Sequence, residues 1–155
     1  MIAVDTNILV YAHRKDSPFH EVAKPAIATL AEGHAAWAIP WPCAHEFLAV
    51  VTSRRIFQYP TSTSGALDQV EVWLESPSLV FLSESAHHWP ELRSLVATGR
   101  IEGARIHDAR IAALCRQHGV RELWSADRDF SRFPELTVIN RAEQDEWVCV
   151  TLQRP

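Results

Sequence analysis

Ile2-Ala3-Val4-Asp5-Thr6-Asn7-Ile8-Leu9-Val10 opens the chain with two apolar runs that enclose three polar residues. The first run has the length of a short buried strand, and the second begins a helical pattern. The polar residues therefore lie where a strand ends and a helix starts. In a parallel sheet with helical connections that edge is where ligands bind, so Asp5 is a candidate site residue.

The alternation of strand patterns and helical patterns continues to residue 139. Strands are predicted at 2–4, 37–39, 79–82, 123–126 and 137–139. Helices are predicted from residue 8 and at 19–32, 42–57, 66–75, 86–97 and 106–118. Strands separated by helices imply βαβ units. We therefore expect an α/β fold, a three-layer α/β/α sandwich around a central, mostly parallel sheet. One domain should span 1–140, with a C-terminal tail at 141–155.

The composition limits the class of protein. The 155 residues are the size of one domain, and 15 basic residues against 19 acidic ones give a net charge of −4. This charge excludes a histone-like protein and argues against a general DNA coat. Cys43, Cys115 and Cys149 form no CxxC pair, which argues against disulfides or a cysteine zinc site. With neither a leader pattern nor an apolar run of membrane length, we expect a soluble cytoplasmic protein without membrane contact.

Three further carboxylates lie where a folding chain gains little from them. Glu46 lies between apolar neighbours near the start of its helix, and Asp108 lies on the predicted buried stripe of the helix at 106–118. Asp127 directly follows the fourth predicted strand. With Asp5, these acids should meet at one edge of the sheet. Clustered carboxylates repel one another unless they bind protons or a cation, and hard oxygen ligands suit Mg²⁺ or Mn²⁺.

Each acid also has a purely structural interpretation. Asp5 could cap the helix that follows it, and Asp108 could interact favourably with its helix dipole. Glu46 could be a solvated acid of a first turn, and Asp127 an ordinary turn residue. Because all four recur at the same predicted edge, the pattern favours a metal site.

Four motifs follow one another along most of the chain. They are Val4-Asp5-Thr6-Asn7-Ile8-Leu9, His45-Glu46-Phe47, Ile106-His107-Asp108-Ala109 and Ser125-Ala126-Asp127-Arg128-Asp129-Phe130. With them the chain resembles the PIN-domain family, and within it the VapC-type toxins of prokaryotic toxin–antitoxin pairs. The resemblance implies a Mg²⁺-dependent endoribonuclease that cuts cellular RNA with metal-activated water. It also implies that Asp5, Glu46, Asp108 and Asp127 are the acidic quartet, while Asp129 leaves the fourth ligand open.

The hypothesis of a metal-dependent endoribonuclease assigns further roles. Asp5 and Asp108 would bind the principal cation, and Glu46 and Asp127 would complete its surroundings. Candidates for hydrogen bonds that hold these carboxylates are Thr6, Asn7 and Ser125. Candidates for contacts with RNA phosphates are Arg14, Arg105 and Arg128. The alternative function is a non-catalytic PIN-like module that binds RNA or a protein through the same surface.

The family also implies partners. These are an RNA substrate, a VapB-type antitoxin that masks the cleft, and a second copy of the chain in a homodimer. Phe19, Phe57 and Tyr59 are candidate interface residues. The segment 93–132 carries eight arginines against five acids, a local charge of +3 toward which RNA would approach. The six tryptophans are predicted to be mostly core or interface residues, and an exposed one could stack on a base.

Overall fold

The computed structural model describes residues 1–142, and in this part of the chain five short strands form one parallel sheet. The strands are β1 (Ile2–Val4), β2 (Trp37–Pro40), β3 (Leu79–Leu82), β4 (Glu122–Trp124) and β5 (Thr137–Ile139). Their order across the sheet is β3-β2-β1-β4-β5. β1, which Asp5 follows, is therefore the central strand. The strand order reverses between β1 and β4, and ligands of parallel sheets bind at the carboxyl ends of the strands at such a point.

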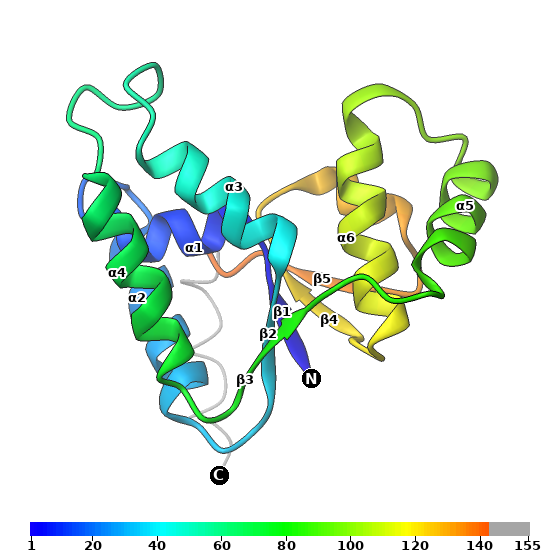
Figure 1. The fold of residues 1–155 in the computed structure, drawn as a ribbon, viewed down its shortest axis with the longest axis horizontal. Helices are drawn as coiled ribbons and strands as arrows, with labels where there is room; N and C mark the ends of the chain where they lie inside the picture. Colours follow the sequence, from blue (N-terminus) through cyan, green and yellow to red (C-terminus); the bar gives the residue numbers. More distant parts are fainter. Residues whose placement is uncertain (143–155) are drawn as a thin grey trace, which may run out of the picture.

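Helices cover both faces of this sheet, which confirms the three-layer arrangement (Figure 1). The α-helices are α1 (Thr6–His13), α2 (His20–Glu32), α3 (Trp41–Val51), α4 (Thr63–Leu74), α5 (His88–Gly99) and α6 (Ile106–Gln117). Two 3₁₀-helices, η1 (Gly103–Arg105) and η2 (Arg128–Arg132), add short turns beside α6 that the sequence pattern did not predict. In Figure 1, α1, α2 and α4 lie on one side of the sheet and α5 and α6 on the other.

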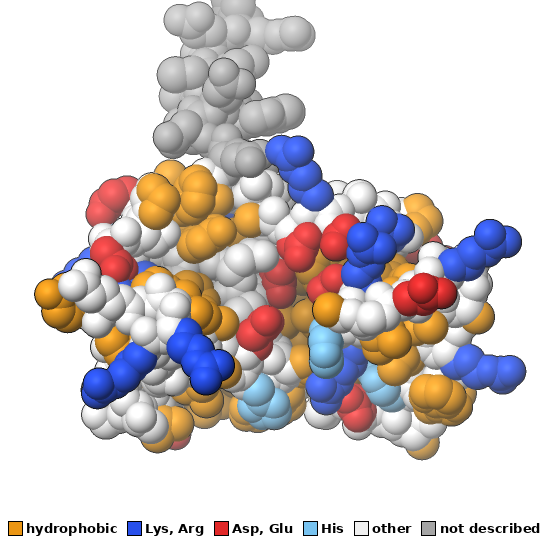
Figure 2. Space-filling model, turned by 90° about the horizontal axis from the view of Figure 1, so that it is seen from above, with side chains coloured by type: hydrophobic (Ala, Val, Ile, Leu, Met, Phe, Trp, Pro, Cys, Tyr) orange, Lys and Arg blue, Asp and Glu red, His pale blue; other side chains and the backbone are white. Residues whose placement is uncertain are grey.

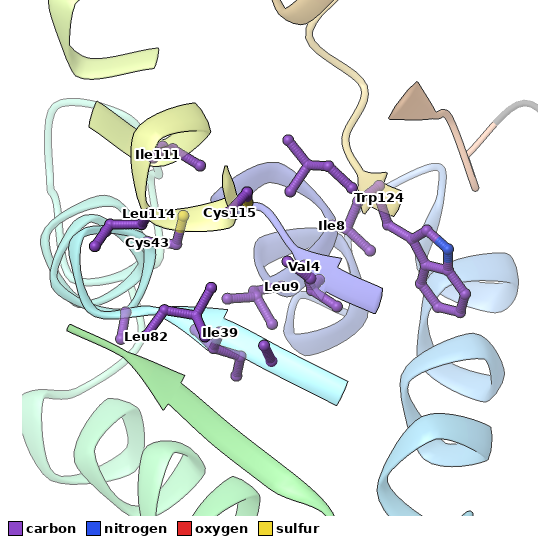
Figure 3. Packing of buried hydrophobic residues seen from close by; sticks show 14 of the residues in the cluster. Val4, Ile8, Leu9, Ile39, Cys43, Leu82, Ile111, Leu114, Cys115 and Trp124 are labelled. Atoms are coloured by element: carbon purple, nitrogen blue, oxygen red, sulfur yellow. The ribbon is translucent and has the colours of Figure 1, made fainter. Parts of the chain in front are cut away.

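Apolar side chains of the strands and of the helices on both faces of the sheet form one core (Figure 3). Val4, Leu9 and Leu114 are fully buried there, and each such side chain contributes about 1.5–3 kcal/mol through burial. On α6, Ile111 and Cys115 lie one and two turns beyond Asp108 and are buried. The packing of α6 therefore holds its first turn, and with it Asp108, at the carboxyl edge of the sheet.

The predicted end of the third helix was wrong. Helix α3 ends at Val51 rather than at residue 57. The hydroxyl of Ser53 accepts the backbone N–H of Arg55, and the Ser53 carbonyl accepts the N–H of Phe57. These local bonds offer the backbone an alternative to the helical ladder, so a turn replaces the last six predicted residues.

The described residues bear on several further predictions. None of their helices is long and apolar enough to cross a membrane. Cys43 and Cys115 are free and buried, whereas Cys149 lies outside the described residues. Most of the predicted tail at 141–155 also lies outside them. At its start, the Arg141 guanidinium lies 4.4 Å from the centre of the Trp124 ring.

Candidate metal centre

The carboxyl edge of the sheet brings the four predicted acids around one hollow. Asp5 caps the N-terminus of α1 directly after β1, and Asp127 caps η2 two residues after Ser125. Together with Glu46 of α3 and Asp108 of α6, they line a cavity of about 390 Å³. Figure 2 looks down on this edge and shows acidic side chains gathered in a hollow at the centre of the face.

Asp5 is the most buried member of the group, with 4% of its surface exposed. Its Oδ1 accepts the Thr6 backbone N–H at 2.8 Å and the Cys43 thiol at 3.5 Å. Its Oδ2 accepts the Ser125 hydroxyl at 2.6 Å and the Asn7 amide at 2.9 Å. Burial, the largest cause, and the charge of Glu46 raise the pKa of Asp5, while the hydrogen bonds from Ser125, Thr6 and Cys43 oppose that rise. Four donors thus hold one carboxylate in a fixed orientation.

Thr6 and Asn7 connect the same carboxylate to two other segments. The Thr6 hydroxyl donates to Glu46 Oε2 at 2.6 Å, which ties α3 to the start of α1. The Asn7 side chain donates to Ser125 Oγ at 3.1 Å and accepts the Ala126 N–H at 3.0 Å. The predicted positioning residues Thr6, Asn7 and Ser125 are therefore all brought to the acids.

Asp127 and Asp129, which the sequence could not separate, have different surroundings. The Asp127 N–H donates to Ser125 Oγ at 3.0 Å, and its Oδ1 accepts the Asp129 N–H at 2.8 Å. Asp127 lines the cavity that it shares with Asp5, Glu46 and Asp108, and Asp129 does not. Asp129 instead pairs with Arg105 at 3.5 Å and with Arg132 at 3.7 Å. These contacts favour Asp127 as the fourth acid.

The pKa of Asp108 is raised by its burial and by the other acids of the cluster. Burial, the largest cause, and then the charges of Asp127, Asp5, Asp129 and Glu46 raise the pKa of Asp108 to about 6. A carboxyl group that is destabilised by its anionic neighbours gains from a nearby cation. The chemistry of the donor set therefore fits a hard divalent cation such as Mg²⁺ or Mn²⁺.

The acids share a cavity, but their side chains are not arranged as a complete set of metal ligands. Among residues 1–142, no three His, Cys, Asp or Glu side chains are drawn together closely enough to hold a metal ion as they stand. Glu46 and Asp127 are exposed, and each is held by a hydrogen bond at one of its carboxylate oxygens.

The three arginines proposed for RNA occupy different environments. Arg14 is buried, pairs with Asp16 and donates to the Tyr59 carbonyl at 2.9 Å. Its guanidinium also lies 4.1 Å from the centre of the Phe57 ring, so these contacts give it a structural role. Arg105 lines a second cavity with Glu46 and Asp108, and its side chain is 52% exposed. Arg128 is exposed in η2.

Two contributors to the centre were not predicted from the sequence. Cys43 donates to Asp5 from the first turn of α3, and His107 lines both cavities beside Asp108. His107 adjoins a predicted acid in sequence and could have been found there. Cys43 could not, because only the fold brings it to a residue 38 positions away.

Comparison with known proteins agrees with this architecture. The profile of the PIN domain family matches residues 2–136. Two ribonucleases of Mycobacterium tuberculosis are similar in sequence. Ribonuclease VapC43 is 36% identical over 136 residues, covering 88% of this chain and 92% of the relative, and Ribonuclease VapC48 is 31% identical over 134 residues, covering 86% and 92%.

A solved structure shares the fold at lower identity. VapBC2 from Rickettsia felis, bound to a DNA fragment from its promoter, superposes with a TM-score of 0.60 at 23% identity. The superposition covers 90% of this chain and 98% of that one. The layers and strand order described above are thus an arrangement that this protein has in common with solved structures.

Proposed function

The chain belongs to the PIN domain family, and from that premise we propose that it is a divalent-metal-dependent endoribonuclease that hydrolyses phosphodiester bonds of cellular RNA. The observation that carries the proposal is the buried Asp5 carboxylate facing the same cavity as Glu46, Asp108 and Asp127. Burying and crowding anionic groups disfavours folding unless a ligand compensates for it. A fold that only bound RNA would gain nothing from repelling the phosphates.

Asp5 and Asp108 would hold the principal cation, and Glu46 and Asp127 would complete its surroundings. When bound, Mg²⁺ supplies positive charge to the phosphoryl oxygens and to the attacking water. The protein's own part is to keep the carboxylates ionised and oriented. Ser125 and the Thr6 N–H oppose the rise in the pKa of Asp5 that burial causes, and Asn7 helps to orient its carboxylate.

Glu46 and Asp127 are suited to a different part of the reaction. Both are exposed to solvent and line the cavity, and among residues 1–142 each accepts one hydrogen bond, from the Thr6 hydroxyl or from the Asp129 N–H. Either can therefore orient a water molecule with its remaining oxygen. On the second cavity, Arg105 would contact the RNA phosphates, and Arg128 would add positive charge in η2.

The proposed partners follow from the VapC-type resemblance. A free ribonuclease endangers its own cell, so a VapB-type antitoxin would mask the acid cavity, and a basic side chain of that partner would complement its charge. The homodimer of the family would involve exposed apolar residues at the loop after α3. Tyr59 there is 78% exposed, whereas Phe19 and Phe57 are only partly exposed.

The direct test is the cleavage of a fluorescent cellular RNA preparation in Mg²⁺ and in EDTA. We expect cleavage in Mg²⁺ alone, and its loss in Asp5→Asn. The matched control is Asp68→Asn, an exposed acid of α4 outside the cavity, which should cleave like the wild type. RNA binding without cleavage in Mg²⁺ would instead support the non-catalytic module.

A further inference from the structure

Three aromatic rings form a stack beside the acid cavity. Trp41 is the first residue of α3 and follows β2 directly. Its ring stacks on Phe81 of β3, with centroids 4.1 Å apart and planes at 21°. The ring of His45, one turn along α3, lies 5.7 Å from the Trp41 centroid at 27°. Trp41 nevertheless remains 37% exposed. We call Trp41, His45 and Phe81 the aromatic shelf.

The shelf opens onto a cavity of its own. Trp41 and His45 line a cavity of about 360 Å³ with Leu82, Glu84 and Arg110. This volume is within the range of about 300–1,000 Å³ that is common for small-ligand sites. The cavity is large enough for a flat ring and is bounded by an aromatic wall.

The cavity of the shelf adjoins the second cavity, which three of the four acids line. Pro42, His45 and Arg110 line both cavities, and the lining of the second includes Glu46, Asp108 and Asp127. A strand with its phosphodiester at the acids therefore has its neighbouring nucleotide within reach of the shelf.

Polar groups stand at the edge of the shelf. The Arg110 guanidinium donates to Glu84 Oε1 at 2.7 Å, which fixes a donor and an acceptor side by side. Proteins that bind single-stranded RNA combine these features, with aromatic rings for the base face and polar groups for the base edge.

We propose that the aromatic shelf binds an unpaired nucleobase of the RNA, next to the phosphodiester that lies at the acids. This inference rests on the proposed ribonuclease function and adds to it a base-binding position at the start of α3, which only an unpaired nucleotide can occupy. A duplex would keep its bases stacked on one another and unable to reach the rings. A loop, bulge or unpaired end can place a base there.

The test measures RNA binding in an Asp108→Asn background, which prevents cleavage. The probes are a fluorescein-labelled adenylate decamer and the same decamer with every base removed. Trp41→Leu keeps an apolar contact with Phe81 but removes the flat ring. We expect it to weaken binding of the decamer about 5- to 140-fold, which is the 1–3 kcal/mol of base–aromatic stacking converted at 1.4 kcal/mol per factor of ten.

Two matched variants make the result specific. Trp41→Phe should restore most of the affinity, because it keeps an aromatic face on Phe81. Trp89→Leu alters a tryptophan that is 67% exposed and lines neither cavity, and it should bind like the background protein. All variants should bind the abasic decamer equally, because it retains the phosphates and lacks the bases. Melting curves confirm that each variant is folded.

Three outcomes would contradict the proposed base site. Trp41→Leu could leave the affinity for the decamer unchanged, or weaken binding of the decamer and of the abasic decamer equally. It could also abolish binding of the antitoxin while RNA binding stays intact. The decamer comparison does not need cleavage, so it decides the shelf even if the wild type proves inactive. Conversely, the wild type could cleave RNA in Mg²⁺ while Trp41→Leu leaves the affinity for the decamer unchanged. That result would contradict the base site and support the ribonuclease function.

Discussion

At the scale of single residues, the Asp5 carboxylate shows how an anion is kept inside a protein. Removing it from water raises its pKa, and the hydrogen bonds from Ser125, Thr6 and Cys43 oppose that rise. With the Asn7 amide, four donors from three segments of the chain contact the carboxylate. The donors restrain both oxygens, so the group keeps one orientation. A preformed ligand of this kind loses little entropy when a cation arrives.

Asp108→Asn should separate a metal ligand from a helix-capping acid. Removing one of several crowded negative charges should stabilise the metal-free protein by about 1–2 kcal/mol. If Asp108 only complemented the dipole of α6, Asn would be neutral or cost up to about 1 kcal/mol. Cleavage in Mg²⁺ should be almost lost, because a neutral amide binds the hard cation weakly. Melting in EDTA together with one cleavage assay measures both, and a less stable but fully active variant would make Asp108 structural.

The unfolding free energy of the metal-free protein should depend on pH because of Asp108. The pKa of Asp108 is about 6 in the folded protein against 3.8 for an ordinary aspartate, so the folded state binds this proton more tightly. The contribution of Asp108 to the unfolding free energy therefore falls as pH rises from about 4 to about 6. Urea unfolding in EDTA should show the advantage of Asp108→Asn at pH 7 and little of it at pH 4.5. An advantage that is independent of pH would contradict this.

Ser125→Ala tests the support of Asp5. The variant removes the 2.6 Å hydrogen bond to the buried carboxylate and the acceptor of the Asp127 N–H. A hydrogen bond to a charged group is worth about 1.5–3 kcal/mol, and the unfolding free energy should fall by an amount in that range. The Mg²⁺ concentration for half-maximal cleavage should rise about 10-fold or more. Ser131→Ala, at an exposed position of η2, is the control that should change neither quantity.

At the scale of elements, the strands were the most predictable part of the fold. β3 and β5 have the predicted bounds, because short apolar runs between polar turns admit few alternatives. The helix ends were less predictable. The end of α3 depends on whether Ser53 bonds to its own turn, and η1 and η2 are too short to leave a periodic pattern.

The acids of the candidate centre were predictable for the same reason as the strands. Each interrupts an apolar pattern at a point where the strand and helix order fixes its place on the sheet edge. The contacts between elements were not predictable. The choice between Asp127 and Asp129 depends on Arg105 and Arg132, and the aromatic shelf depends on β3 lying beside β2. Only the folded chain brings those pairs together.

The contacts of Arg14 belong to this scale, because they join the end of α1 to the loop at 52–62. Arg14→Gln should lose the ion pair with Asp16 and the contact with Phe57, and destabilise the protein by about 1–3 kcal/mol. Its cleavage rate below the melting temperature should stay near that of the wild type. Arg105→Gln should behave oppositely, with unchanged stability and slower cleavage at limiting RNA. A large cleavage defect in Arg14→Gln would instead support the predicted contact of Arg14 with RNA phosphates.

At the scale of the whole molecule, the exposed apolar residues bear on assembly. Ile56 and Tyr59 lie on the loop after α3 and are 58% and 78% exposed, and Leu67 and Val72 on α4 are 50% and 56% exposed. A surface of this kind is typical of an interface. Sedimentation at micromolar concentration should show a dimer, and Tyr59→Ser together with Ile56→Ser should shift it toward monomer. Monomer throughout, with no toxicity when the chain is expressed alone, would contradict the toxin assignment.

The central position of β1 has a consequence for the making of this protein. Asp5 is synthesised 120 residues before Ser125, whose hydroxyl holds it. At about 5–20 residues per second, translation needs about 6–24 s to supply that partner. Asp108 is also missing for most of this interval, and Asp127 is missing for all of it. The nascent chain therefore carries an incomplete centre until β4 and the residues that directly follow it are made.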